Sequence, residues 1–273
     1  MNELQTSIND YLNYCKTQKR LDEKTLKAYR IDLRQFSEQI SVHKNTEIDS
    51  AVIEKHIAAL HHKYQPKTVK RKIASLKAFF HFLEYKDLIE KNPFTRIEIH
   101  FREPVRLPRT IPLHTVETLL TTIYTCQKNA KTTHQKRCSL RDAAVVELLF
   151  ASGMRISELC TLHAKDVNLF DGIILIYGKG SKERRIQIGN ESVLCTLKKY
   201  QSDFQLEIEH CGHFFANSNG KVLSDQSVRR MIKKYAELAG IDMHITPHMF
   251  RHTFATSLLE ADVDIRYIQE MLG

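Results

Sequence analysis

The sequence lacks an apolar run long enough to cross a membrane, and it lacks a recognisable export signal. Its first residues, MNELQTSINDYL, contain no basic lead into an apolar stretch. No segment approaches the length of about 20 apolar residues that a membrane-spanning helix needs. The sequence therefore predicts no membrane-spanning helix, and we expect a cytoplasmic protein.

The sequence also lacks closely spaced metal-ligand and disulfide motifs. Its six cysteines are scattered, with no C-x-x-C pair and no compact set with histidine. We therefore predict reduced, mostly structural thiols and no metal site. A glycine-rich P-loop is missing from Gly153–Leu159 and from residues 172–188, so neither segment indicates a nucleotide cofactor.

Positive charge is present in excess and is unevenly placed. The 273 residues carry 41 Lys and Arg against 32 Asp and Glu, a formal net charge of +9. Residues 1–112 hold 21 basic and 14 acidic side chains, whereas residues 113–273 hold 20 and 18. Nucleic acid is the leading candidate partner, although the charge alone equally fits a solvated basic surface. The length allows two domains, each with its own core.

Residues 1–99 are predicted to form a helical domain. Apolar residues recur at helical spacing from Leu4 to Tyr14, over residues 21–40, and after Ser50, which can cap a third helix. A fourth helix is expected from Lys67 to just before Asn92-Pro93, because proline disfavours helix at the preceding residue. Basic side chains gather near its start and are expected to bind DNA: Lys67, Lys70, Arg71, Lys72 and Lys77.

Residues 100–112, HFREPVRLPRTIP, are predicted to form an extended, basic interdomain linker. They hold three prolines and follow neither a helical nor a strand period. Three arginines, Arg102, Arg106 and Arg109, extend the expected DNA-binding surface. The alternative is a loop inside one domain, which the change in charge across the segment makes less favourable.

Residues 113–273 are predicted to form an α-rich domain with a small antiparallel β-sheet. Helical periodicity covers three stretches, Leu113–Tyr124, Arg141–Ala151 and Ser224–Leu238. Asp264 can cap a last helix. Between residues 172 and 188 the period changes, because IILIY and RIQI alternate as strands around the turn sequence GKGSKER, which carries Lys179. The fold class is therefore mainly α.

The stretch TPHMFRHTFAT, from Thr246 to Thr256, places an imidazole and a guanidinium on the first turn of a helix. Thr246 suits the N-cap and Pro247 suits the first helical position. His248 and Arg251 stand three residues apart and share one face beside unpaired amides, where an anion is stabilised. This indicates a phosphate site, and a capped surface helix with a solvated arginine is the alternative.

Four side chains in three separate segments complete the pattern: Arg155 in ASGMRISEL, Lys179 in GKGSKER, and His248 with Arg251 in TPHMFRH. In this order and context they resemble the tyrosine recombinases of the phage integrase family, most closely the bacterial Xer-type proteins. T-x-x-x-Y-x-x-D-L-x-x-F at 25–36 and FFHFLEYKDLIEKNP at 79–93 are similar to the family's N-terminal domain. The resemblance implies a SAM-like DNA-binding domain at 1–99 and the tyrosine recombinase catalytic fold at 113–273.

These residues suit phosphodiester cleavage without a metal. The guanidiniums of Arg155 and Arg251 can hold the non-bridging phosphate oxygens and supply the charge that a metal would contribute. By resemblance, Lys179 gives a proton to the departing 5′ oxygen, His248 hydrogen-bonds the phosphate or moves a proton, and Glu158 supports the site. The family's 3′-phosphotyrosyl link stores the bond energy, so no cofactor is expected.

Three further basic residues flank the hairpin tip and are expected to touch DNA backbone phosphates: Lys182, Arg184 and Arg185. Taken singly, Arg155, Glu158 and Lys179 also have ordinary interpretations, as a helix bridge, its surface partner and an exposed turn residue. The matching contexts of all of them together favour the catalytic interpretation.

The family continues past Leu272-Gly273 with a His or Trp that contacts the phosphate and then with the nucleophilic tyrosine. This sequence ends at Gly273. Tyr267 is the only tyrosine after Arg251, and it falls in a segment that the family packs under the site, so we expect it to be structural. We expect residues 1–273 to bind a DNA phosphate without cleavage in cis. We also expect a monomer, since the family's tail joins the protomers of a DNA-bound homo- or hetero-tetramer.

Three functions remain open at this point. The first is the core of a nucleoid-associated, site-specific recombinase that clamps double-stranded DNA. The second is a non-catalytic DNA-binding regulator, and the third is a type IB topoisomerase-like enzyme, which shares the chemistry. Within the first class, the basic stretch Lys128–Arg137 slightly favours a mobile-element integrase over a Xer-type resolvase of chromosome dimers.

Overall fold

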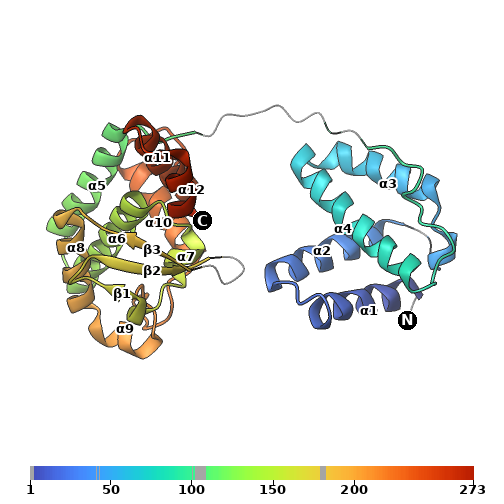
Figure 1. The fold of residues 1–273 in the computed structure, drawn as a ribbon, viewed down its shortest axis with the longest axis horizontal. Coiled ribbons are helices and arrows are strands. Elements are labelled where there is room, and N and C mark those ends of the chain that lie inside the picture. Colours follow the sequence, from blue (N-terminus) through green and yellow to red (C-terminus); the bar gives the residue numbers. More distant parts are fainter. Residues whose placement is uncertain (1–2, 41, 43, 100, 102–108, 179–182) are drawn as a thin grey trace. The chain divides into compact units, whose positions relative to one another are not determined.

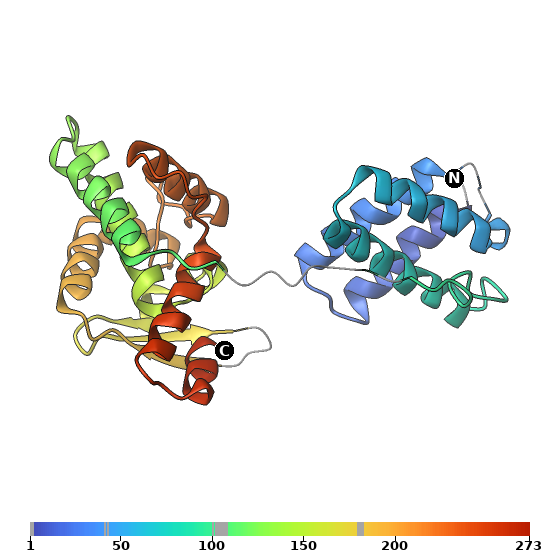
Figure 2. The ribbon, with the colours of Figure 1, turned by 90° about the horizontal axis from the view of Figure 1, so that it is seen from above.

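The computed structural model describes residues 3–40, 42, 44–99, 101, 109–178 and 183–273. The chain divides into two compact units, Met1–Arg106 and Leu107–Gly273, each with its own hydrophobic core (Figure 1, Figure 2). The division falls within the segment predicted as a linker. No helix of the described ranges is long and apolar enough to span a membrane.

Four α-helices build the first unit: α1 Glu3–Thr17, α2 Glu23–Gln39, α3 Ser50–Lys63 and α4 Pro66–Tyr85, with a 3-10 turn η1 at Asn45–Glu47. Helix α4 packs against each of the other three. Its buried Phe79 meets Tyr11 of α1, and its buried Phe80 meets Phe36 of α2 edge to face. The four predicted helices of this unit are therefore confirmed.

Two helix boundaries in the first unit differ from the prediction. Asp49, and not Ser50, caps α3, because its carboxylate accepts from the Val52 amide at 3.0 Å. Helix α4 ends at Tyr85, well before Asn92-Pro93. Asp87 adopts a left-handed φ of 55°, and the Leu88 amide returns to the Leu83 carbonyl at 2.9 Å, a pattern that terminates helices.

The second unit is built around α6, Thr133–Ser152, whose residues Ala143–Leu149 are all buried. Helices α5 Leu113–Lys128, α8 Glu191–Asp203 and α11 Pro247–Glu260 pack against it. The remaining helical elements are α7 Ile156–Cys160, η2 Ala164–Asp166, α9 Gln205–Cys211, α10 Asp225–Leu238 and α12 Ile265–Leu272. The predicted helices are present, Asp264 caps α12 as expected, and α7, α8 and α9 are additional.

The predicted hairpin is part of a three-stranded antiparallel sheet of order β1-β2-β3. Its strands are β1 Val167–Asn168, β2 Ile173–Tyr177 and β3 Glu183–Gln187. Residues 174, 176, 184, 186 and 188 alternate onto the inner face, where the isoleucines among them join the core. The small antiparallel sheet within a mainly α fold is thus confirmed.

The basic stretch Lys128–Arg137 is mostly absorbed into these helices. Thr132 caps α6, its hydroxyl accepting from the Gln135 amide at 3.2 Å, and Arg137 lies in the first turns. The Arg137 guanidinium donates to Glu207 at 2.7 Å and lies over the Phe204 ring. This arginine therefore ties α6 to α9 and is not a surplus surface charge.

One buried carboxyl group weakens the core at neutral pH. Glu147 of α6 is 6% exposed; one of its oxygens accepts from the Tyr124 hydroxyl, and the other has no partner within the described chain. Burial raises the pKa of Glu147, although hydrogen bonds from Tyr124 and Thr196 act in the opposite direction. Stability from this group is present below its ordinary pKa and is lost as pH rises through the raised value.

Replacing Glu147 with Gln should therefore stabilise the fold at alkaline pH by about 1 kcal/mol, because the amide keeps the acceptor for Tyr124 and removes a buried charge. Denaturant unfolding at pH 8 and at pH 4.5 measures this, and the advantage should shrink at the lower pH. Glu117→Gln on the exposed side of α5 is the matched control. An advantage that is equal at both pH values would contradict the argument.

Candidate active site

Arg155 is positioned by the tight connection between α6 and α7. Gly153 ends α6 with a left-handed φ of 58°, and a side chain there would collide with the Phe254 ring. Two residues later Arg155 is the N-cap of α7, and its amide donates to Glu158 at 2.8 Å. Its guanidinium Nη1 also donates to Glu158, at 2.9 Å. The arginine is thus held at both ends by one carboxylate.

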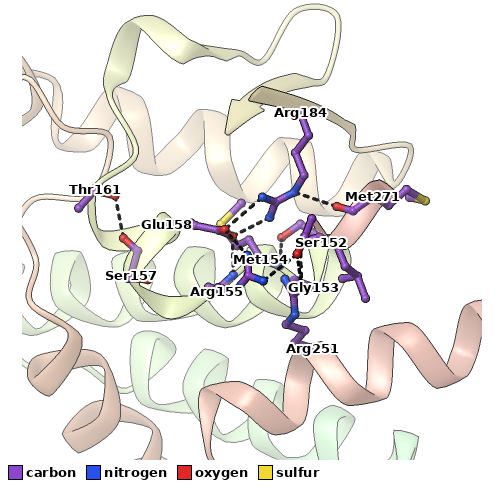
Figure 3. Close-up of polar contacts among 12 residues, drawn as sticks. Ser152, Gly153, Met154, Arg155, Ser157, Glu158, Thr161, Arg184, Arg251 and Met271 are labelled. Carbon is purple, nitrogen blue, oxygen red and sulfur yellow. Dashed lines mark hydrogen bonds and ion pairs between the residues drawn. The ribbon is translucent and has the colours of Figure 1, made fainter. Parts of the chain in front are cut away.

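Glu158 pairs with two arginines, the partly exposed Arg155 and the largely buried Arg184. Its carboxylate is 7% exposed and also accepts from Nη1 and Nη2 of Arg184, at 3.1 and 2.6 Å (Figure 3). Burial raises the pKa of Glu158, but the hydrogen bonds from Arg184 and then Arg155 outweigh it and leave the pKa below its ordinary value. The carboxylate is therefore ionised at neutral pH.

Arg251, on the first turn of α11, meets Arg155 at a single oxygen. Its Nη2 lies 3.4 Å from the Gly273 carbonyl, which also accepts from Nη2 of Arg155 at 2.7 Å. It also donates to Gly153 at 3.2 Å and to Leu272 at 2.9 Å. Burial and the nearby charge of Arg155 lower the pKa of Arg251 to about 10, so it stays charged at neutral pH. The two guanidiniums therefore converge on one acceptor position.

His248 lies three residues before Arg251, at the N-terminus of α11, and is exposed. Partial desolvation, followed by the positive charge of Arg229, lowers the pKa of His248; His252, Arg251 and Arg155 act in the same direction. The imidazole is therefore neutral at pH 7 and can either accept or donate a hydrogen bond.

Arg229 of α10 is a residue that sequence reasoning missed. It lies on the exposed, basic side of an amphipathic helix whose other side buries Val228 and Ile232. The helical periodicity of α10 could have identified this exposed basic side, but the proximity of Arg229 to His248 depends on tertiary packing.

A cavity of about 730 Å³ opens beside the arginines. Its wall includes Arg155, Arg184, Arg185, Tyr267 and Gly273. Helix α12 packs against α11 and β3 through buried Ile268, as expected, whereas the Tyr267 side chain on it is 63% exposed and does not contribute to that packing. Gly178, the last described residue before the β2–β3 connection, also lines this cavity.

The structure brings together Arg155, Glu158 and Arg251, with His248 on the same helical turn as Arg251. Lys179 and Lys182 lie outside the described residues, as do Arg102 and Arg106. Arg185 is exposed, in agreement with an outward-facing role. Arg184 is only 8% exposed and is bound to Glu158, which revises the prediction that it contacts DNA.

In the first unit, α4 presents most of its predicted basic residues to solvent: Lys67, Lys70, Arg71 and Lys77 are exposed, and so is Arg109 of the second unit. Lys72 differs, because its side chain is 5% exposed and its ammonium donates to Asp32 at 3.0 Å. It also lies 4.9 Å from the centre of the Tyr64 ring. Lys72 therefore has an internal role, which revises its prediction as a DNA contact.

Each of the two units matches a known protein family. Residues 114–273 match the Phage integrase family, and residues 8–86 match the family described as Phage integrase, N-terminal SAM-like domain. This chain belongs to the phage integrase family of tyrosine recombinases. The family resemblance predicted from these sequence motifs is confirmed, including its Xer-type character and its N-terminal SAM-like domain.

Two curated relatives of this tyrosine recombinase illustrate the match. A protein named Tyrosine recombinase from Agathobacter rectalis is 68% identical over 273 residues, covering 100% of this chain and 89% of the relative. Tyrosine recombinase XerD from Staphylococcus saprophyticus subsp. saprophyticus is 34% identical over 277 residues, covering 99% of this chain and 90% of the relative.

Solved structures share the tyrosine recombinase fold. A lambda integrase (75-356) dimer bound to a COC' core site superposes with a TM-score of 0.74 at 18% identity, covering 100% of this chain and 95% of that one. XerH site-specific recombinase bound to difH substrate gives 0.73 at 23% identity, covering 96% of this chain and 77% of that one. At these identities the likeness supports the fold.

The electrostatic link between α10 and His248 can be tested by histidine titration. Replacing Arg229 with Gln should move the pKa of His248 upward, because a cation that opposes protonation is removed. NMR chemical shifts of the imidazole carbons against pH report the midpoint. Lys233→Gln, one turn along the same helix, should leave the midpoint unchanged. Equal midpoints in the wild type and the Arg229→Gln protein would refute the proximity.

Proposed function

We propose that this protein is a site-specific DNA recombinase whose second unit binds one backbone phosphate at the scissile position. The observation that carries this is the convergence of Arg155 and Arg251 on the same carbonyl oxygen, at 2.7 and 3.4 Å. Two guanidiniums that reach one acceptor can hold two oxygens of a phosphate with little rearrangement. His248 supplies a third polar group on the same helical turn as Arg251.

In the proposed reaction each described residue has a separate task. Arg155 and Arg251 stabilise the charge that develops on the non-bridging oxygens of the pentacoordinate phosphorus. His248, neutral at pH 7, donates a hydrogen bond to one of these oxygens or moves a proton. Glu158 fixes Arg155, and Lys179 is proposed to protonate the departing 5′ oxygen. The phosphotyrosyl link of the family conserves the bond energy, so the reaction needs no nucleotide cofactor.

Within residues 1–273, Tyr267 is not proposed as the nucleophile. It is a solvent-exposed residue of α12, placed at the cavity and preceding the last turn whose carbonyls contact Arg251. We propose that residues 1–273 alone bind the phosphate as a monomer without cutting the strand. The family's tyrosine-bearing continuation would supply both the nucleophile and the contacts of a DNA-bound tetramer.

We propose that duplex DNA is bound mainly through phosphates on exposed basic residues of both units. The residues concerned are Lys67, Lys70, Arg71, Lys77, Arg109 and Arg185, together with Arg102, Arg106 and Lys182 outside the described ranges. Binding of this kind releases counterions, so affinity should fall steeply with salt. The solved structures of lambda integrase bound to a COC' core site and bound to DNA support DNA as the partner. The proposed place of action is the nucleoid.

A suicide substrate, nicked so that a cut strand cannot be rejoined, tests the proposal. Residues 1–273 should bind this DNA without forming an adduct. The same residues, extended by the tyrosine-bearing continuation of a Xer-type relative, should form a covalent adduct. In the extended protein Arg251→Gln should slow this step by about 100-fold or more, because a transition-state charge contact is lost. Tyr267→Phe is the matched control and should leave the adduct yield unchanged.

The other outcomes separate the remaining functions. Specific binding without an adduct in the extended protein would favour a DNA-binding regulator. Relaxation of supercoiled plasmid without sequence preference would favour a type IB topoisomerase. Loss of the adduct on Tyr267→Phe substitution would overturn the assignment of the nucleophile.

A further inference from the structure

Arg184 of β3 is a cation that faces inward. Strand alternation places it on the same face as Ile186, and in the register it lies opposite Ile176, which is 2% exposed. The next residue, Arg185, points to the exposed side. A guanidinium on the core face of a strand is costly unless it is paired, so its partners indicate its role.

All three guanidinium nitrogens of Arg184 are engaged. Nη1 and Nη2 donate to the two carboxylate oxygens of Glu158, at 3.1 and 2.6 Å, and Nε donates to the Met271 carbonyl at 2.9 Å (Figure 3). Turning this side chain toward DNA would leave the largely buried carboxylate without its bidentate partner, which is unfavourable. These contacts favour an interior position for Arg184 over a direct contact with DNA.

The contacts of Arg184 join three elements of the site. It is the second residue of β3, five positions after Lys179, and it reaches Glu158 of α7 and the last turn of α12. Glu158 in turn holds the amide and Nη1 of Arg155. The strand that leads out of the Lys179 hairpin is thus fixed to the element that carries the phosphate-binding arginine.

The pairing of Arg184 with Glu158 also affects which nitrogens of Arg155 the carboxylate can bind. A lone carboxylate beside Arg155 would pair with both terminal nitrogens of that guanidinium and compete with a phosphate for them. With Arg184 occupying both oxygens, Glu158 holds Arg155 through Nη1 and its amide, and Nη2 is left pointing at the convergent acceptor position. Arg184 thereby keeps one donor of Arg155 available.

We propose that Arg184 is a positioning residue for phosphate binding: it acts through Glu158 to leave Nη2 of Arg155 directed at the scissile phosphate. This rests on the proposed function, because it presumes that Arg155 binds a DNA phosphate. It differs from the role expected for Arg184 from the sequence, in which the side chain would touch DNA directly.

The test uses residues 1–273 and duplex DNA that the chain selects from a random pool. Single methylphosphonate substitutions locate the phosphate whose neutralisation weakens wild-type binding most. The Kd for the duplex with a methylphosphonate at that position, divided by the Kd for the natural duplex, then measures the contribution of that phosphate to binding. For Arg184→Gln this ratio should fall by about tenfold, the size of one charge-assisted contact. For Arg185→Gln both affinities should weaken together and the ratio should persist.

A second substitution separates positioning from simple loss of charge. Arg184 is proposed to act through Glu158, so removing the carboxylate as well should release Nη2 of Arg155 from pairing with it. The double variant Arg184→Gln, Glu158→Gln should therefore show a Kd ratio between that of Arg184→Gln and that of the wild type. Arg184→Lys keeps the charge but cannot bridge both oxygens in the same way, and it should give an intermediate ratio. Thermal unfolding identifies folded variants, and the double variant and Arg184→Lys carry the test if Arg184→Gln does not fold.

The possible failures are distinguishable. If no single methylphosphonate weakens binding by the wild type, the proposed function fails. If one does, and the folded Arg184 variants keep the full wild-type Kd ratio for it, the positioning role is overturned. Equal weakening on both duplexes, as for Arg185→Gln, would instead restore Arg184 as a direct DNA contact and would also overturn it.

Discussion

The carboxylate of Glu158, shared between Arg155 and Arg184, is the interaction on which the site depends. It lies at the third position of a five-residue helix that is too short to be stable by itself, and it fixes the N-cap residue of that helix through the Arg155 amide. The same carboxylate binds the sheet through Arg184. One ionised group therefore sets the relative positions of α7 and β3. Because Arg251 is close by as well, the cluster keeps an excess of positive charge suited to an anion.

The end of α12 shows how that excess is satisfied within residues 1–273. Carbonyls of Met271, Leu272 and Gly273 accept from Arg184, Arg251 and Arg155. The carbonyl end of a helix carries partial negative charge, so it is an electrostatic substitute for the anion that the arginines attract. The Gly273 carbonyl occupies the point where Arg155 and Arg251 meet. A bound phosphate oxygen would have to replace this acceptor in order to contact both guanidiniums.

Local patterns predicted much of the fold and part of the site. The first turn of α11, the hairpin and the Arg155–Glu158 spacing are encoded over a few residues, and the structure contains each of them. The positions of two basic side chains, Arg184 and Lys72, could not be predicted from local charge alone. Arg184 was predicted to contact DNA because of its positive charge and its place beside the hairpin tip, whereas the register of β3 places it on the inner face with Ile186. Lys72 is buried by Asp32, a partner 40 positions away that no periodicity predicts.

A crystal structure of residues 1–273 on the duplex that they select tests the central claim most directly, because it shows which acceptor the arginines hold. The account predicts one backbone phosphate within hydrogen-bond distance of both Arg155 and Arg251, with the Gly273 carbonyl displaced from Arg155. It would be contradicted if the DNA is bound while both guanidiniums keep their carbonyl partners and every phosphate lies beyond their reach.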